Sequence, residues 1–149
     1  MKRAGFTMIE LIFVIVILGI LAAVAIPKLA ATRTDAKVSK DASDVATALS
    51  DMGSYYTAHG KFGTVGDMTN VKFVTKDGKT DAKGTKVSGG TVYFNDSTST
   101  NCLKFTGSAK DGNITIESES NSTSECKGLN KAVEKLEKIH SFGGSSIEY

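Results

Sequence analysis

The chain has 149 residues, with 18 basic and 16 acidic side chains and a formal net charge of +2. This length allows one small domain plus an anchor, but not two domains. A charge so close to balance excludes a strongly basic nucleic-acid-binding domain. The sequence contains no nucleotide-binding loop, no Cys-x-x-Cys pair and no histidine spacing typical of metal sites. His59 and His140 are isolated, and we expect structural or solvated roles for both. We therefore predict no catalytic residue, no metal ligand, no cofactor and no enzymatic activity.

The first predicted element is an apolar helix over residues 6–26. Lys2 and Arg3 precede it, and Glu10 is the one ionisable residue inside it. About 20 apolar residues cross the ~30 Å hydrocarbon core of a bilayer, and the two positive charges predict a cytoplasmic N-terminus. A carboxylate inside such a segment costs about 3 kcal/mol on insertion scales and usually marks a functional site. Glu10 is therefore a candidate site residue.

The sequence Gly-Phe-Thr-Met-Ile-Glu at residues 5–10, followed by the apolar run, resembles the processing site of type IV pilin-like precursors. Gly19 and Pro27 also match this family. The resemblance implies that prepilin peptidase cuts between Gly5 and Phe6 and methylates the new amine of Phe6. The apolar helix then stays with the mature protein, whereas an ordinary signal peptide is removed with its apolar core.

Two other fates of this segment remain open. Ala23-Val24-Ala25 has the small-x-small form that ordinary signal peptidase prefers, and cleavage there would release a soluble domain that begins at Ile26. Glu10 would interrupt the apolar core of such a signal, which disfavours this alternative. The other alternative is an uncleaved single-pass anchor.

The resemblance also implies roles in filament assembly. Glu10 accepts the Phe6 amine of an adjacent protomer and so sets the axial register, because a buried carboxylate needs a cationic partner. The alternative is a tolerated polar residue that reaches the membrane surface by snorkelling. Gly19 and Pro27 bracket a segment of weak helix propensity, which can lose helicity on assembly in this family. A simple kink of a membrane helix is the alternative.

The helical periodicity resumes after Pro27 and predicts one long helix from about Thr7 to Ala58. A helix of this size is about 75–80 Å long, so one small domain cannot cover its first half, which must lie in lipid or among other subunits. The apolar stripe of the second half recurs three or four positions apart and comprises Val38, Ala42, Val45, Leu49, Met52 and Tyr56.

Charged pairs and a glycine complete the prediction for this helix. Residues four apart can pair on its exposed face, so we expect ion pairs between Lys37 and Asp41 and between Lys40 and Asp44. Gly60 is expected to end the helix.

Beyond residue 60, short β-rich runs alternate with turn signals. The runs are Val71–Thr75, Thr91–Asn95, Leu103–Thr106 and Asn113–Glu117. They predict a three- or four-stranded antiparallel meander that packs on the apolar stripe. The predicted fold class is therefore α+β, with a long N-terminal helix on a small sheet and a short C-terminal helix. The expected segments are a leader (1–5), a transmembrane and filament-core helix (6–26), an amphipathic helix half (27–60) and a periplasmic β-rich head domain (61–149).

The short C-terminal helix is predicted from an amphipathic stripe. Its apolar face comprises Leu129, Val133, Leu136 and either Ile139 or His140. The glycines and serines at residues 143–146 are expected to end it, and residues 147–149 to add an edge strand.

Cys102 and Cys126 both lie in the part of the chain that is expected to be exported. An oxidising compartment favours a disulfide between them, and two reduced, buried thiols are the alternative. A bridge that closes a loop of about 25 residues would stabilise a small domain by roughly 3 kcal/mol.

Three weaker patterns occur in the head domain. Asn113 and Asn121 fit the acid-x-Asn-x-Ser/Thr acceptor of bacterial N-glycosylation, a pattern that arises readily by chance in Ser/Thr-rich loops. Five lysines within residues 72–86 could contact DNA, but few aromatic residues accompany them, which favours a solvated loop. The acidic residues near the hairpins, Asp96, Asp111 and Glu119, match no compact calcium loop. We therefore do not expect nucleic acid or a metal ion as a partner.

These features predict a structural subunit of a pilin-like filament, most consistent with the pseudopilus of a type II secretion system. The alternatives are a type IV pilus for adhesion, motility or DNA uptake, and a membrane-tethered binding module. Expected partners are further copies of the chain, prepilin peptidase, the inner-membrane assembly platform and other minor pilin-like subunits. We expect a bacterial inner-membrane protein with a cytoplasmic N-terminus and a periplasmic head, which becomes part of a periplasmic or surface filament. Loss of Lys2 and Arg3 with the leader would leave 16 basic and 16 acidic side chains.

Overall fold

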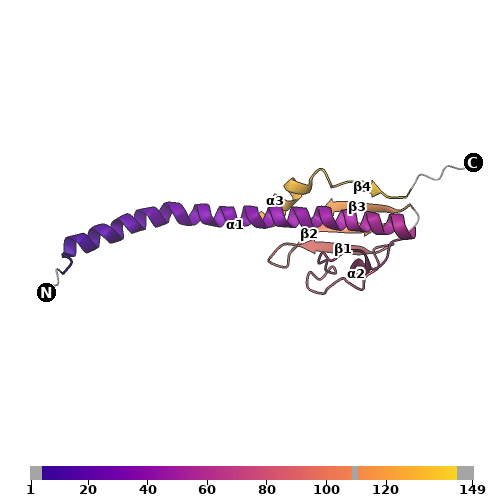
Figure 1. Ribbon diagram of the computed structural model, residues 1–149, viewed down its shortest axis with the longest axis horizontal. Helices are drawn as coiled ribbons and strands as arrows, with labels where there is room; N and C mark the ends of the chain where they lie inside the picture. Colours follow the sequence, from indigo (N-terminus) through magenta and orange to yellow (C-terminus); the bar gives the residue numbers. More distant parts are fainter. Residues whose placement is uncertain (1–4, 109–110, 144–149) are drawn as a thin grey trace, which may run out of the picture. The chain divides into compact units, whose positions relative to one another are not determined.

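The computed structural model describes residues 5–108 and 111–143. A long helix is followed by a four-stranded antiparallel sheet and a short C-terminal helix, so the predicted α+β class is confirmed (Figure 1). The chain divides into two compact units between Thr34 and Asp35. The elements are α1 (Met8–His59), α2 (Val65–Met68), β1 (Thr91–Asn95), β2 (Asn101–Gly107), β3 (Asn113–Ser118), α3 (Ser124–Val133) and β4 (Ile139–Ser141).

The predicted bounds of the long helix are confirmed to within one residue at each end. The helix continues through Pro27, where the missing N–H removes only one backbone hydrogen bond. Gly60 follows the helix with a φ of 68°, and its N–H donates to the carbonyl of Tyr56 over 2.7 Å. This left-handed conformation favours glycine and satisfies one of the last helical carbonyls, so the predicted helix end is also confirmed.

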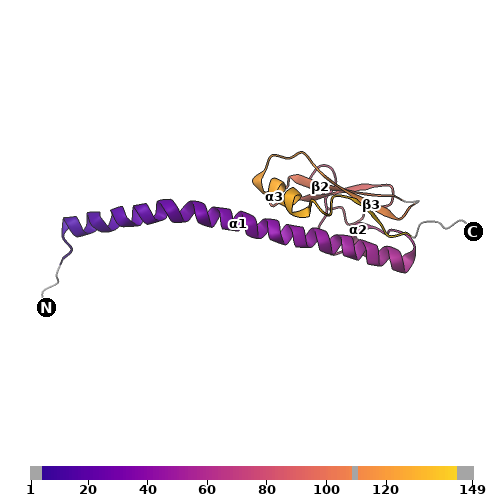
Figure 2. The ribbon, with the colours of Figure 1, turned by 90° about the horizontal axis from the view of Figure 1, so that it is seen from above.

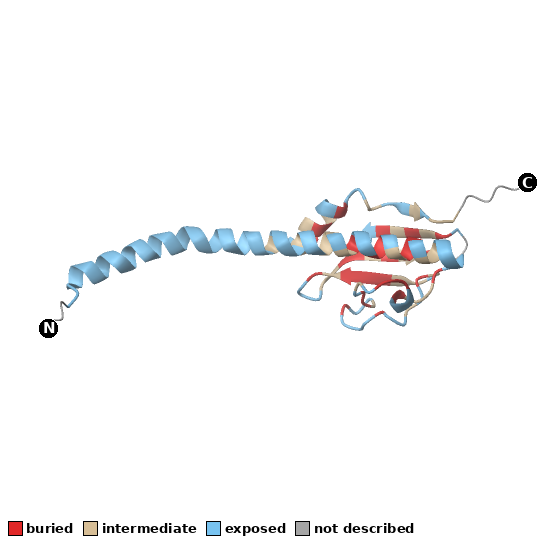
Figure 3. Ribbon diagram, viewed as in Figure 1, coloured by how far each residue is buried: buried red, intermediate tan, exposed pale blue. Residues whose placement is uncertain are grey.

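The N-terminal unit exposes its apolar side chains. Between Phe6 and Leu29, the exposed fraction of the large apolar residues runs from 41% at Ile17 to 89% at Phe6. Figure 3 shows this part of α1 in the colour of exposed residues. The helix is long and apolar enough to cross a membrane by length and composition. Its apolar surface therefore needs an environment that this unit does not supply.

The second unit is built on the remaining part of α1. Figure 2 shows the sheet and α3 lying along this part of the helix. The buried residues of α1 are Val45, Ala48, Leu49, Met52 and Gly53. All but the glycine pack in one core with three phenylalanines, Phe73, Phe94 and Phe105, and the ring of Phe73 meets the other two edge to face. The predicted stripe from Ala42 to Tyr56 is therefore the face of α1 that packs on this core, whereas Val38 lies beside Gly128 of α3.

The sheet has the strand order β1-β2-β3-β4, with antiparallel neighbours throughout. The predicted strands at residues 91–95, 103–106 and 113–117 are confirmed within this sheet. The predicted strand Val71–Thr75 is wrong, because only Val74 forms isolated bridges, to Tyr93 and to Asp81. The Asp77 carboxylate accepts the N–H groups of Lys79 and Thr80, so a tight turn follows at once and leads the chain away from β1.

The C-terminal helix is shorter than predicted. Leu129 and Val133 are buried on α3 as expected, but Ile139 and His140 belong to β4. The N–H of Leu136 donates to the carbonyl of Val133 over 2.6 Å, which turns the chain out of the helix. The free edge of β3 then pairs with residues 139–141. The predicted terminator at residues 144–146 and the strand at 147–149 lie outside the described residues.

One of the two predicted ion pairs on α1 is confirmed. The ammonium of Lys40 lies 2.6 Å from the carboxylate of Asp44. The predicted Lys37–Asp41 pair is wrong, because α3 brings Glu125 to within 2.8 Å of the Lys37 ammonium. Tertiary packing thus replaces a local pair by a long-range one that joins α1 to α3.

Close backbone packing at Gly107 generates a stability prediction. A Cβ atom on this residue would lie 2.5 Å from the carbonyl oxygen of Val87, and that segment is held by a hydrogen bond from Gly89 N–H to the Gly107 carbonyl. Gly107→Ala should therefore lower the free energy of unfolding of a fragment containing residues 28–149 by about 2 kcal/mol. Gly84→Ala is the matched control, because Gly84 has open space at the Cβ position and an ordinary φ. Equal urea midpoints for the two variants would contradict the prediction.

Candidate assembly site and disulfide junction

The predicted cleavage site lies in the exposed segment that leads into α1. Gly5, Phe6 and Thr7 precede the helix, and all three are exposed. The backbone N–H and the hydroxyl of Thr7 both donate to Oε2 of Glu10, over 2.8 and 2.7 Å, and the N–H of Glu10 lies 3.3 Å from the Thr7 hydroxyl. This reciprocal arrangement is a capping box, which satisfies amide groups that a helix start leaves unpaired.

The capping box holds the Glu10 carboxylate at the first turn of α1. Every hydrogen bond that it accepts from the described residues goes to Oε2. Within the described part of the chain, the other oxygen, Oε1, accepts no hydrogen bond. The predicted register role of Glu10 needs an acceptor oxygen.

Gly19 and Pro27 both lie inside the continuous helix α1. A Cβ atom on Gly19 would meet no other atom within 4 Å, so no packing contact with the residues that the structure describes requires glycine there. The predicted loss of helicity concerns the assembled state and stays a prediction.

The predicted disulfide joins Cys102 of β2 to Cys126 of α3, with 5.0 Å between their Cα atoms. Both cysteines are fully buried. The bridge ties the middle of the sheet to the helix that follows it.

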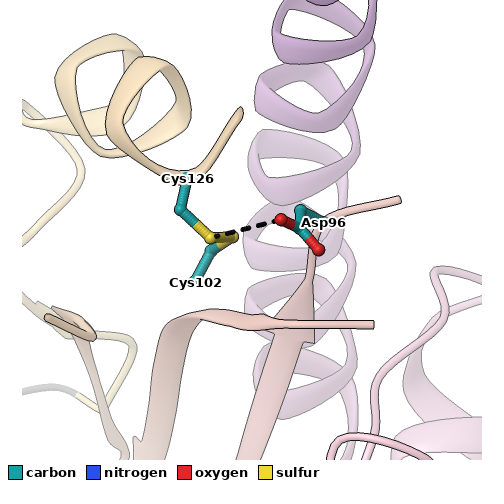
Figure 4. A group of neighbouring side chains, drawn as sticks. All are labelled: Asp96, Cys102 and Cys126. Atoms are coloured by element: carbon teal, nitrogen blue, oxygen red, sulfur yellow. Dashed lines mark hydrogen bonds between the residues drawn. A yellow bond between two sulfur atoms is a disulfide. The ribbon is translucent and has the colours of Figure 1, made fainter. Parts of the chain in front are cut away.

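Asp96 is a buried acid beside this bridge (Figure 4). It follows β1 and its exposed fraction is 6%. Its Oδ1 accepts hydrogen bonds from the N–H and hydroxyl of Thr98 and from the N–H of Thr100, over 2.7–2.9 Å. Its Oδ2 accepts from the hydroxyl of Thr123 over 2.9 Å. Burial raises the pKa of Asp96, but these hydrogen bonds outweigh it, and the net pKa lies below the usual aspartate value.

Three elements meet around Asp96. Thr123 is the N-cap of α3, and its hydroxyl accepts from the N–H of Cys126 while it donates to Asp96. Glu125 of α3 accepts from the N–H and hydroxyl of Ser97 in the loop after β1, and from Lys37 of α1. We call Asp96, Thr123 and the Cys102–Cys126 bridge the disulfide junction. It fastens the β1–β2 loop to α3, and Glu125 extends the connection to α1.

The disulfide junction does not fit a metal ion. One ligand atom from each of Asp96, Cys102 and Cys126 lies within 4.8 Å of the others, but sulfurs joined in a disulfide carry no thiolate charge to bind a cation. The Asp96 oxygens are also engaged with hydrogen-bond donors. Among the described residues, Asp96, Asp111 and Glu119 form no common cluster.

A hollow of about 550 Å³ opens between α1, the residue 72–79 segment and the loop after β1. Lysines and aspartates both line it, including Lys37, Lys40, Asp41, Asp44, Lys72 and Lys79. Burial raises the pKa of Asp41 above its usual value. Charges of both signs line the hollow, so these residues do not single out a ligand of one charge.

The weaker sequence patterns occupy ordinary structural positions. Asn113 lies in β3 with a buried Oδ1, and the side-chain amide of Asn121 donates to the carbonyl of Asn101 over 3.1 Å. Glycosylation of the folded domain would have to disturb these positions. The five lysines within residues 72–86 are exposed, and none forms an ion pair within the described part of the chain. This arrangement agrees with a solvated loop.

Sequence reasoning missed the capping role of Thr7 and the whole set of contacts around Asp96. The Thr-x-x-Glu spacing at residues 7–10 is a recognisable capping-box signal. The Asp-Ser-Thr-Ser-Thr sequence at residues 96–100 is typical of a turn in which a carboxylate binds nearby amides. No local signal connects Asp96 to Thr123, because 27 positions separate them.

The charge of Asp96 generates a pH-dependent stability prediction. Because its folded pKa is lowered, the ionised carboxylate stabilises the folded state above the ordinary aspartate pKa of about 4, and this contribution is lost as the pH falls through the folded pKa. Asp96→Asn should therefore lower the free energy of unfolding of the 28–149 fragment by about 2 kcal/mol at pH 7, and the difference should narrow between about pH 5 and pH 3.

Chemical denaturation at several pH values checks this prediction. Asp35→Asn, which changes an exposed aspartate on α1, is the control and should leave stability at pH 7 unchanged. A difference between wild type and Asp96→Asn that stays constant with pH would contradict the role of the charge.

Comparison with known proteins gives one match. Residues 1–26 match the family model described as the prokaryotic N-terminal methylation motif. No curated protein and no solved structure matches the chain. The matched region contains the predicted cleavage site, the Thr7–Glu10 capping box and the apolar start of α1. Residues 1–26 thus carry a prepilin-type methylation motif, which supports kinship with the type IV pilin-like proteins.

Proposed function

We propose that the chain is a structural subunit of a pilin-like filament, which assembles through α1 after prepilin peptidase cuts between Gly5 and Phe6. The observation that carries this proposal is the uncovered apolar surface of α1, which begins at the residue after the proposed cut. A signal peptide removed by ordinary signal peptidase would leave the protein without this surface. The N-terminal methylation motif supports retention of the helix.

The apolar surface has two suitable environments in succession. Before assembly, the bilayer covers the helix, and the exposed fractions along residues 6–29 allow lipid contact on every side. In a filament, helices of neighbouring subunits replace the lipid. Transfer between two apolar environments avoids exposing the helix to water, where its large side chains would each cost about 1.5–3 kcal/mol.

Glu10 supplies a polar contact for this transfer. Cleavage converts the peptide nitrogen of Phe6 into a cationic amine, and methylation keeps its charge. Oε2 of Glu10 already binds Thr7, which leaves Oε1 for the amine of a neighbouring subunit. An ion pair in apolar surroundings is favourable only when both partners are placed well, so we propose that this contact fixes the axial register.

The proposed location is the bacterial inner membrane, with the head domain in the periplasm. Both cysteines of the head are oxidised in the structure, which agrees with an exported domain. The proposed assembly is the pseudopilus of a type II secretion system, and its proposed partners are the inner-membrane platform and other pilin-like subunits. A type IV pilus is the alternative assembly, with the same chemistry at its N-terminus.

The mass of the N-terminal peptide tests processing. Protein isolated from its native membrane should give a peptide that begins at Phe6 and carries one added methyl group. A peptide that begins at Ile26 would contradict the proposal and indicate a secreted soluble domain. An intact Met1 would indicate a simple anchored protein.

Two substitutions of Glu10 separate the ion pair from the helix cap. Glu10→Gln keeps the capping box, because glutamine also caps at this position, but it removes the charge. We expect normal cleavage and at least a tenfold loss of filaments for this variant, and the same loss for Glu10→Val. Filaments recovered by shearing and counted by electron microscopy provide the measurement. Normal assembly of Glu10→Gln would overturn the register role, and failure of cleavage in both variants would assign Glu10 to processing.

Deletion of the gene in its native host distinguishes the two assemblies. A pseudopilus subunit is required for release of secreted enzymes into the medium, so deletion should trap these enzymes in the periplasm. Loss of surface filaments with intact secretion would favour the type IV pilus.

A further inference from the structure

The disulfide junction contains a charge whose effect reaches beyond folding. Asp96 is buried, ionised and adjacent to the bridge, and Oδ2 lies 3.8 Å from Sγ of Cys126 (Figure 4). A disulfide sulfur has no hydrogen to donate, so this approach is a contact and not a hydrogen bond. Both sulfurs have an Asp96 oxygen within 4.8 Å. We infer that the Asp96 carboxylate slows thiol–disulfide exchange at the Cys102–Cys126 bridge by repelling negative charge.

The chemistry of exchange explains why a carboxylate acts in this way. An external thiolate forms a bond to one cysteine sulfur, the S–S bond breaks, and the bonding electron pair leaves on the other sulfur as a thiolate. A second thiolate of the same reagent then displaces the first cysteine. The reagent is oxidised to its disulfide, and the two cysteines become thiols after protonation.

Asp96 opposes this reaction whichever sulfur is attacked. If the reagent attacks Cys102, the negative charge develops on Cys126, which lies next to the Asp96 carboxylate. If it attacks Cys126, the incoming thiolate itself approaches that carboxylate. Like charges at this separation repel strongly in a poorly hydrated site. The carbonyl of Thr100, 3.5 Å from Sγ of Cys102, presents a further partial negative charge to the bridge.

The hydrogen bonds of Asp96 keep the carboxylate in place. The three donors on Oδ1 and the Thr123 hydroxyl on Oδ2 stabilise its ionised form and orient it toward the bridge. The disulfide is thus protected by charge as well as by burial. An exported subunit that meets thiols outside the cell would keep its α3 attached through this protection.

The charge of the attacking reagent distinguishes electrostatic protection from burial. The full mature protein in detergent is reduced with cysteamine, which carries an ammonium group, or with 2-mercaptoethanesulfonate, which carries a sulfonate. The second-order rate constant for each reagent is corrected for its thiolate fraction. Both reagents require the same local opening of the buried bridge. A substitution that changes this opening equilibrium therefore changes both rate constants by the same factor and leaves their ratio unchanged.

We expect Asp96→Asn to be reduced about tenfold faster than wild type by the sulfonate reagent. The ratio of the cysteamine constant to the sulfonate constant should fall about threefold in this variant. Two controls accompany it. Thr123→Val loosens the disulfide junction and keeps the charge, and Asp111→Asn removes one exposed acid beyond the far end of β2. Both controls should retain the wild-type ratio.

Each outcome decides the inference. A lowered ratio in Asp96→Asn alone supports it. An unchanged ratio with a faster rate, equal to that of Thr123→Val, would overturn it and show that Asp96 acts only on the opening of the domain. An equal fall of the ratio in Asp111→Asn would assign the effect to the net charge of the head.

Discussion

The apolar surface of residues 6–29 is the constraint on which the remaining features depend. The helix of this unit exposes its large side chains on every face, so the chain needs lipid or other helices around it. In the proposed function, the cut lies on the N-terminal side of the helix, so the mature protein keeps this apolar surface. Keeping the helix is therefore the central step. Among the described residues, the buried positions of α1 all lie after Asp35, in the second unit.

A small head domain buries little apolar surface, so it needs stabilising contacts besides core packing. Domains of about 100 residues bury a modest fraction of their surface, and a covalent link contributes stability that packing alone does not supply. In this head the disulfide and the buried Asp96 stand together between β1, β2 and α3. The hydrogen bonds that offset the burial of one carboxylate also organise the loop and the N-cap, so a single charge connects three elements.

Long, strongly periodic elements could be predicted from the sequence, whereas contacts between distant segments could not. The 3.6-residue period and Gly60 determine α1, and alternation determines β1 to β3. The short C-terminal helix was predicted too long because Ile139 continues the spacing of Leu129 and Val133, while the free edge of β3 competes for the same residues. At the candidate site, the N-terminal motif and the cysteines were recognisable, but the partners of Asp96 and Lys37 depend on packing that no local pattern encodes.

The Glu10 carboxylate of the capping box offsets an electrostatic cost of the proposed cut, which lies just before α1. A new amine there puts a positive charge at the positive end of the helix dipole, which is unfavourable. Glu10 in the first turn offsets this charge within the subunit, and in the proposed filament its Oε1 oxygen binds the amine of a neighbour. Each subunit then binds one neighbour through its Phe6 amine and another neighbour through its Glu10 carboxylate. A contact of this heterologous kind adds one subunit after another, and it extends into an open helical polymer where the rotation between copies does not close a ring.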